Sequence, residues 1–160
     1  MTKARAFWLQ GIGQGSILEE TLGSPRPGWC KVKAMYSALS PGTERLVSLG
    51  QVPPDLYEEM RCPYMGGAFP FPVKYGYSLV GRITEGSKEY KGQIVHILHP
   101  HQDHCLVSLE DIYPLPANVP PQRATLASNL ETAVNAIWDS QISLGEKALV
   151  VATGGYAELI

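Results

Sequence analysis

Three histidines and an aspartate follow one apolar segment in a short run whose side chains suit a metal. They are His99, His101, Asp103 and His104, and they come directly after the apolar residues 93–98. Alternating imidazoles and a carboxylate at the end of a strand can ligate one or two zinc ions and activate water for hydrolysis. The run therefore raises a metal-dependent hydrolase as one functional hypothesis.

The spacing of this run resembles that of metallo-β-lactamase-type hydrolases. That resemblance implies further metal ligands downstream, histidine included, yet no histidine follows His104. The chain instead continues directly into another apolar stretch, 105–108. We therefore favour a polar loop between two strands and keep the metal-dependent hydrolase as the weaker alternative.

A second candidate is the glycine-rich segment 11–16, GIGQGS, which superficially matches a dinucleotide-binding fingerprint. Its sixth position is Ser16, and a strand-like segment follows where the fingerprint requires a helix. We interpret it as a hairpin turn and reject nucleotide binding there.

A third candidate is the glycine turn at 152–157, ATGGYA, which follows the uniformly apolar run 148–151. Such a run is typical of a strand buried on both faces of a parallel sheet. A glycine turn after it lets the backbone approach a pyrophosphate. Gly154 and Gly155 are therefore the candidate cofactor-binding residues, while the acidic residue expected about 20 positions later would lie beyond Ile160.

Composition limits the classes of partner. The 160 residues carry 13 basic and 15 acidic side chains, a net charge of −2, which argues against nucleic acid or an anionic membrane as a main partner. No apolar run approaches the roughly 20 residues of a membrane span, and residues 1–10 lack the apolar region of a signal peptide. The three scattered cysteines indicate no disulfide framework and favour a cytoplasmic location.

The sequence predicts strands in its first part, up to Pro121, and a helix followed by one strand after it. All 13 prolines lie between Pro25 and Pro121, where short apolar or alternating segments predict strands. The expected strands are 4–10, 16–22, 28–39, 78–84, 93–98 and 105–108, with a long structured loop at 53–73. Apolar residues at helical spacing then predict one helix over 122–140, followed by a strand at 148–151.

Several segments in this order resemble the medium-chain dehydrogenase/reductases, a family that includes the zinc alcohol dehydrogenases. The matching segments are 39–44 (LSPGTE), 75–83, 91–95, 114–116, 132–133 and 148–157. Segments 40–44 and 129–135 look closest to the bacteriochlorophyllide dehydrogenase-like branch. The resemblance implies a mainly β fold: a GroES-like, partly open β-barrel at 1–121, then at 122–160 a linking helix and the first strand of an incomplete Rossmann domain.

The chain departs from the zinc members of that family. Where they carry catalytic zinc ligands, this sequence has Pro41, Tyr77 followed by Ser78, and Ser128. A neutral hydroxyl binds zinc poorly compared with thiolate, imidazole or carboxylate. The lobe that holds structural zinc is replaced by the short loop 99–104. We expect neither catalytic nor structural zinc.

The resemblance implies that Thr43 hydrogen-bonds the substrate oxygen and starts a proton relay. Tyr77, in the former histidine position, is a second catalytic candidate, and Glu44 and Glu131 are nearby carboxylates, with Glu131 interpreted as a solvated helix position. The implied reaction is hydride transfer between NAD or NADP and a small alcohol or carbonyl substrate. Aromatic residues of the barrel loops suggest an apolar or planar one.

Two hypotheses about the whole chain stay open. In the first, the chain is a truncated part of a zinc-independent dehydrogenase or reductase, which on its own would bind no NAD(P), because one strand cannot form a dinucleotide crevice. In the second, it is a stand-alone GroES-like module that binds a ligand or partner through loop 53–73 without catalysis.

Overall fold

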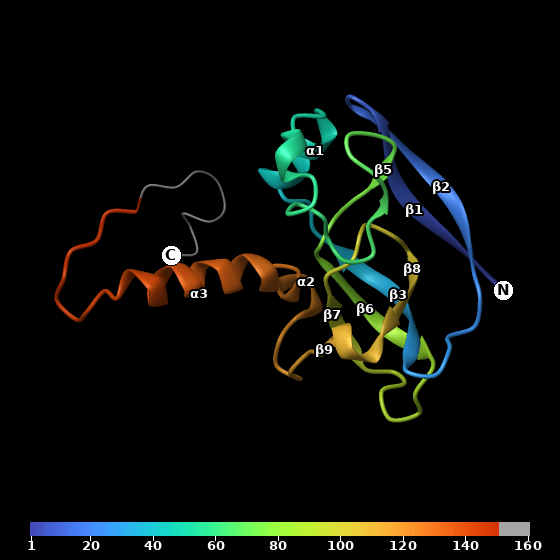
Figure 1. The fold of residues 1–160 in the computed structure, drawn as a ribbon. Helices are drawn as coiled ribbons and strands as arrows, with labels where there is room; N and C mark the ends of the chain where they lie inside the picture. Colours follow the sequence, from blue (N-terminus) through green and yellow to red (C-terminus); the bar gives the residue numbers. More distant parts are fainter. Residues whose placement is uncertain (151–160) are drawn as a thin grey trace.

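The computed structural model describes residues 1–150, and two antiparallel sheets form the framework of this part (Figure 1). The first sheet has the order β2-β1-β5-β4. Its strands are β1 (Thr2–Gly11), β2 (Gln14–Leu22), β4 (Gly66–Gly67) and β5 (Val73–Lys74). The β1–β2 hairpin turns at Gly13, whose positive φ of 64° suits glycine, which confirms the hairpin turn expected there.

The second sheet has the order β8-β3-β6-β7-β9. Its strands are β3 (Trp29–Ser37), β6 (Leu79–Glu85), β7 (Ile94–Ile97), β8 (His104–Ser108) and β9 (Tyr113–Pro114). A register shift interrupts the β3–β6 ladder between Ala34 and Tyr36. Such a bulge bends the strand and re-aims the side chains beyond it.

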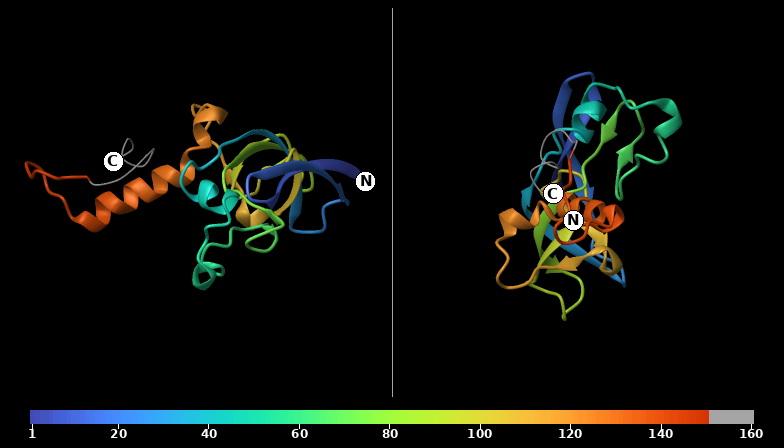
Figure 2. Two further views of the ribbon diagram at one scale, coloured as in Figure 1. Left: turned by 90° about the horizontal axis from the view of Figure 1, so that it is seen from above. Right: turned by 90° about the vertical axis from the view of Figure 1, so that its left-hand side faces the viewer.

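Residues 101–103 join the two sheets. Phe7 N–H donates to His101 O at 2.9 Å, Asp103 N–H to Arg5 O at 3.0 Å, and Ala34 N–H to Asp103 O at 2.8 Å. This segment thus bonds to β1 on one side and β3 on the other, and Figure 2 shows the strands wrapped around a shared interior. The expected fold class, a mainly β and partly open barrel followed by a helix, is confirmed.

Two apolar clusters fill this interior. The cluster under the second sheet contains Cys30, Val32, Leu79, Ile83, Val95, Ile97, Cys105, Val107 and Ile112. The cluster beside the first sheet contains Leu9, Val47, Val52, Phe69, Val73 and Tyr75. Loop 53–73 packs Tyr57, Met60, Cys62 and Met65 against this cluster beside the first sheet. The loop includes a 3₁₀ turn at Pro54–Leu56 and strand β4.

The helices differ from the expectation in two ways. Helix α1 (Thr43–Ser48) is not among the predicted elements, because residues 39–44 follow the expected strand 28–39 and were interpreted only by their resemblance. The single helix expected over 122–140 is instead α2 (Pro121–Ala124) and α3 (Ala127–Ser140). Ser78 Oγ donates to Thr125 O, and Thr125 Oγ1 donates to Gln122 O at 2.7 Å, so the break is held by side-chain hydrogen bonds.

The expected strand at 148–151 is not found in residues 148–150, which form no regular structure. A strand needs a neighbour for its ladder, and within residues 1–150 none lies beside this segment. Val151 and the candidate cofactor residues Gly154 and Gly155 lie outside the described residues.

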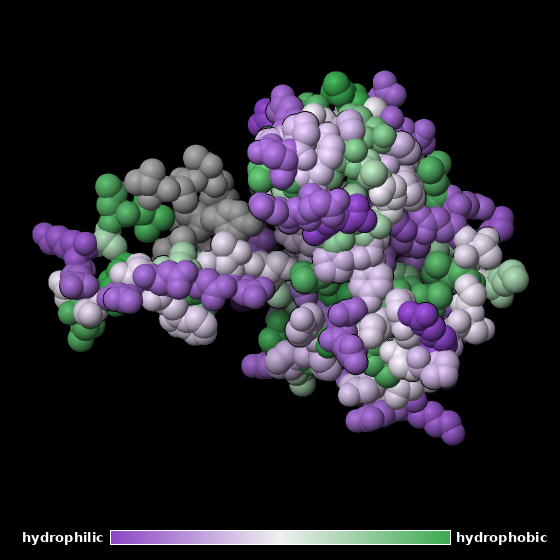
Figure 3. Space-filling view, in the orientation of Figure 1, coloured by the Kyte–Doolittle hydropathy of each residue, from purple (hydrophilic) through white to green (hydrophobic). Residues whose placement is uncertain are grey.

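Helix α3 extends away from the β strands (Figure 1), and its apolar residues Leu130, Val134, Ile137 and Trp138 are exposed. Elsewhere, hydrophilic side chains cover most of the face seen in Figure 3, and hydrophobic ones form small separate patches. Within residues 1–150, every helix is too short or too polar to cross a bilayer.

Candidate active site

The two residues predicted to act in catalysis lie in different elements. Thr43 is the first residue of α1 and is half-buried. Tyr77 lies between β5 and β6 and packs against the apolar cluster beside the first sheet. Its ring meets the ring of Tyr75 edge-on, with 6.3 Å between the centroids. No hydrogen bond joins Thr43 to Tyr77 among the described residues.

A hydrogen-bonded chain of Ser37, His101 and Glu44 lies directly beside Thr43. His101 Nε2 is 2.7 Å from Glu44 Oε2, and His101 Nδ1 is 2.9 Å from Ser37 Oγ. The second Glu44 oxygen, Oε1, accepts from the backbone N–H of Ser40 at 2.9 Å. Glu44 therefore anchors the turn that leads into α1 and so fixes the position of Thr43.

The hydrogen bonds among Ser37, His101 and Glu44 could not be predicted from the sequence, because His101 lies far from the other two residues in it. In the sequence His101 is a candidate metal ligand, and Glu44 lies 57 residues before it. The contact depends on the segment 101–103 bridging both sheets, which no local pattern indicates. The one signal in the sequence is that Glu44 and His101 each lie within a candidate segment, 39–44 and 99–104.

Gly76 makes room for the imidazole of His101. Its φ is +134°, and a Cβ there would lie 2.9 Å from His101 Nε2 and 3.0 Å from Cδ2. Gly92 has a comparable φ of +88° but open space around it. The two glycines thus share the backbone requirement and differ in the contact with His101.

We expect Gly76→Ala to lower the free energy of unfolding by about 1 to 3 kcal/mol more than Gly92→Ala does, because the added methyl group collides with His101. The backbone strain of a non-glycine residue at positive φ is common to both variants. Urea unfolding of the two variants measures the difference. Equal losses would show that His101 does not fill the space beside Gly76.

Two pockets flank the Ser37–His101–Glu44 chain. One, of about 360 Å³, is lined by Glu44 together with Leu39, Ser40, Pro41 and Tyr75 among others. The other, of about 450 Å³, is lined by Ser37 and His101 with Phe7, Ile17, Ala34 and Met35 among others. Glu44 therefore borders one cavity, and Ser37 and His101 border the other.

The metal-site interpretation of the histidine run is wrong for these residues, because their side chains point to different partners. His99 is buried, with its ring stacked on Tyr64 at 5.2 Å between centroids. Asp103 pairs with Arg5 at 3.0 Å and with His104 at 3.2 Å, whereas His101 binds Glu44. Among residues 1–150, no three His, Cys, Asp or Glu side chains lie close enough together to hold a metal ion.

Burial lowers the pKa of His99 to about 4, and burial also lowers that of His96. An unfolded histidine takes up its proton near pH 6.5, so between pH 6.5 and 4 the unfolded state binds more protons than the folded state. The stability conferred by the neutral His99 is therefore complete above pH 6.5 and is lost as the pH falls towards 4.

We expect the free energy of unfolding to fall between pH 7 and pH 5, and His99→Gln to make this fall shallower, leaving the part due to His96. Urea midpoints at several pH values measure the slopes, with His104→Gln as the control at a half-exposed histidine. A slope unchanged by His99→Gln would contradict a neutral, buried His99.

The positions that the resemblance matches to the catalytic metal ligands of zinc alcohol dehydrogenases carry no residues that suit zinc. They carry Pro41, Tyr77 and Ser128, and Ser128 Oγ donates to the backbone oxygen of Tyr77 at 3.4 Å. A pyrrolidine, a phenol and a hydroxyl supply no thiolate, imidazole or carboxylate. This donor set does not fit zinc, so no step is assigned to a metal at these positions.

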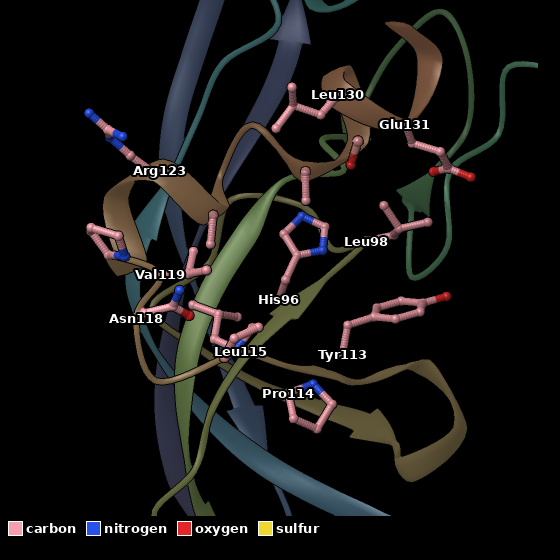
Figure 4. Close-up of a pocket in the computed structure, with 15 residues that line it drawn as sticks. His96, Leu98, Tyr113, Pro114, Leu115, Asn118, Val119, Arg123, Leu130 and Glu131 are labelled. Atoms are coloured by element: carbon pink, nitrogen blue, oxygen red, sulfur yellow. The ribbon is translucent and has the colours of Figure 1, made fainter. Parts of the chain in front are cut away.

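A larger pocket of about 550 Å³ lies between β7, β9 and the start of α3 (Figure 4). His96 stands in its floor, with Leu98 and Tyr113 beside it and Glu131 at its edge. His96 Nε2 is buried and has no hydrogen-bond partner among residues 1–150. Glu131 is exposed on α3, as expected for a solvated helix position.

Comparison with solved structures identifies the fold. No family model and no curated protein matches the sequence. An E. coli protein described as a short chain alcohol dehydrogenase, solved with NADH, aligns with a TM-score of 0.68 at 15% identity. The quinone oxidoreductase of Coxiella burnetii aligns with a TM-score of 0.65 at 14% identity, and that of Thermus thermophilus, also solved with NADPH, with 0.60 at 19%.

These alignments cover 89%, 91% and 89% of this chain but only 47%, 47% and 43% of the three solved chains. The chain thus spans less than half the length of the proteins it matches. The chain shares its fold with these alcohol and quinone oxidoreductases, which confirms, at the level of the fold, the resemblance drawn from the sequence.

Proposed function

We propose that this chain is the substrate-binding part of an NAD(P)-dependent oxidoreductase that acts on a small alcohol or carbonyl compound. In this proposal residues 1–121 are the substrate domain, and residues 122–160 lead into a nucleotide-binding domain of the same polypeptide. The observation that carries the proposal is the fold, which proteins solved with NADH and NADPH share over about nine-tenths of the chain.

Thr43 is the proposed contact to the substrate oxygen. A hydroxyl group both donates and accepts a hydrogen bond, so it can pass a proton to or from that oxygen. Its place at the start of α1 is fixed by the neighbouring Glu44, which binds the Ser40 N–H and His101. Pro41 and Glu44, close to Thr43 in the sequence, line the pocket of about 360 Å³, although Thr43 itself does not. The proposal therefore places the substrate oxygen at the edge of this pocket.

Tyr77 is the proposed second hydrogen-bond donor to the substrate oxygen. A phenol can donate to a carbonyl, and Tyr77 occupies the position where zinc relatives have a metal ligand. The nicotinamide, when bound, would supply or accept the hydride. Gly154 and Gly155 are the proposed contacts to its pyrophosphate, by their place in the sequence.

We expect Thr43→Val, in a protein that contains this chain and a nucleotide-binding domain, to lower turnover about 100-fold, the usual contribution of a positioned proton-transfer group. Valine has nearly the same shape and lacks the hydroxyl. Thr21→Val is the matched control, because Thr21 is exposed on β2. Steady-state nicotinamide oxidation measures both, and unchanged turnover in Thr43→Val would remove Thr43 from the mechanism.

A further inference from the structure

The hydroxyl end of the Ser37–His101–Glu44 chain has the connectivity of an activated nucleophile. Ser37 Oγ lies 2.9 Å from His101 Nδ1, and His101 Nε2 lies 2.7 Å from Glu44 Oε2. A serine, a histidine and a carboxylate joined in this order also form the catalytic triads of many unrelated folds, in which the serine bonds Nε2 and the carboxylate bonds Nδ1. Here the two ring nitrogens are exchanged, and the imidazole still links the hydroxyl to the carboxylate.

The partners of His101 determine which nitrogen carries its proton. An ionised carboxylate only accepts hydrogen bonds, so Nε2–H donates to Glu44. In the neutral ring Nδ1 then presents a lone pair, which accepts from the Ser37 hydroxyl. Glu44 is itself held by the Ser40 N–H at 2.9 Å, so the carboxylate keeps the imidazole in the orientation that a general base needs.

His101 and Glu44 are more buried than Ser37, as this chemistry requires, because the nucleophile must be accessible to the substrate. The side chains of His101 and Glu44 are only 10% and 12% exposed, whereas Ser37 is exposed. The hydroxyl opens onto the pocket of about 450 Å³, whose walls combine the apolar Phe7, Ile17 and Met35 with the charged Arg5 and Asp103. An ester with a short apolar acyl group matches these walls and would bring its carbonyl to Ser37.

We propose that Ser37 is an acyl-accepting nucleophile that hydrolyses small esters of apolar acids, with His101 as general base and Glu44 as the residue that positions it. Ser37 Oγ bonds to the ester carbonyl carbon while its proton passes to His101 Nδ1. The ester C–O bond breaks, and the proton on His101 passes to the departing alcohol.

Water then attacks the acyl-serine, and His101 takes its proton and returns it to Ser37 Oγ. The products are the carboxylic acid and the alcohol. No oxidation or reduction occurs and no cofactor is consumed, so this activity goes beyond the proposed oxidoreduction and is independent of it.

The test uses this chain with 4-nitrophenyl butyrate as substrate and a fluorophosphonate as a covalent probe of activated serines. We expect nitrophenolate release and a phosphonyl group located on Ser37 by peptide mass spectrometry. Ser37→Ala should abolish both, and His101→Asn and Glu44→Gln should lower the rate of release at least about 100-fold. Because Ser37 is exposed, its replacement by alanine should leave the fold intact.

Ser48→Ala is the matched control and should keep the wild-type rate, because the Ser48 hydroxyl donates to Arg45 O and has no imidazole partner. Failure of wild-type protein to react, labelling of a different serine, or an undiminished rate in Ser37→Ala would each overturn the proposal. Since no nicotinamide takes part, none of these results bears on the proposed oxidoreduction.

Discussion

Lys74→Met is expected to lower the free energy of unfolding by about 3 kcal/mol, because it removes one partner of a buried charge pair. Lys74 Nζ lies 2.8 Å from both oxygens of Glu20 and 3.0 Å from Gln102 Oε1. Glu20 also accepts from Trp8 Nε1 at 3.0 Å and from Gln102 Nε2 at 3.1 Å. Lys74 therefore joins β5, β2 and the bridging segment 101–103 through one carboxylate.

The side chains of Lys74 and Glu20 are 11% and 26% exposed. Burial works to raise the pKa of Glu20, but the hydrogen bonds and charge of Lys74, with those of Trp8 and Gln102, outweigh it and leave the pKa lowered. The pair therefore stabilises the fold above the ordinary pKa of a glutamate, and this contribution is lost as the pH falls through the lowered value.

Urea unfolding at pH 7 measures the loss, and the control is Lys3→Met. Lys3 forms an ion pair of similar length with Glu19, 2.9 Å, but both side chains are largely exposed, so its replacement should cost at most about 1 kcal/mol. The double variant Lys74→Met/Glu20→Gln should recover part of the loss by removing the unpaired charge. Equal costs for Lys74→Met and Lys3→Met would contradict a buried network.

The second large effect is expected at Leu79. Its side chain is fully buried in the apolar cluster under the second sheet. Strand β6, which carries Leu79, lies between β3 and β7. Truncating a buried leucine to alanine costs about 2 to 5 kcal/mol, from lost burial and the cavity left behind. We expect Leu79→Ala to lower the free energy of unfolding by about 3 kcal/mol.

Leu39→Ala is the control, since Leu39 is 68% exposed, and its cost should stay below about 0.5 kcal/mol. Thermal and urea unfolding should rank the two variants in the same order. A loss at Leu79 as small as that at Leu39 would show that the second sheet does not enclose the core described above.

The strands were predictable because their pattern is local. The expected segments 4–10, 16–22, 78–84 and 93–98 each overlap a strand, since alternation or a short apolar run directly reflects burial on a sheet. Alternation was less informative in β3. Alternation with Cys30 and Val32 places Lys31 on the opposite, polar face, yet Lys31 is buried, because its Nζ reaches Glu85 Oε2 at 2.9 Å and Thr2 Oγ1 at 3.0 Å.

Features that depend on distant contacts escaped prediction. The apolar spacing over 122–140 continues through Thr125, and the break there is held by Ser78, a residue 47 positions earlier. Helix α1 begins at a glycine cap without a side-chain hydrogen bond, so the usual signal for a helix start is missing. At the break between α2 and α3 a tertiary hydrogen bond holds the local structure, and at α1 the local sequence signal is absent.

In the candidate site, too, the sequence indicated some residues, whereas contacts between distant residues could not be predicted from it. Thr43 and Tyr77 were singled out by resemblance, and their roles stay predictions. The Ser37–His101–Glu44 chain became visible only when the bridging segment 101–103 placed His101 over Gly76 and against α1. Residue types identified the groups capable of chemistry, and the fold determined their partners.

Deuteride transfer tests the proposed oxidoreduction most directly. A protein that contains this chain and a nucleotide-binding domain is incubated with NADH or NADPH deuterated at the reactive carbon and with a panel of aldehydes and ketones. We predict an alcohol product that carries deuterium on the former carbonyl carbon, formed far more slowly by Thr43→Val. A folded protein that transfers no deuterium to any of these compounds from either cofactor would contradict the proposed function.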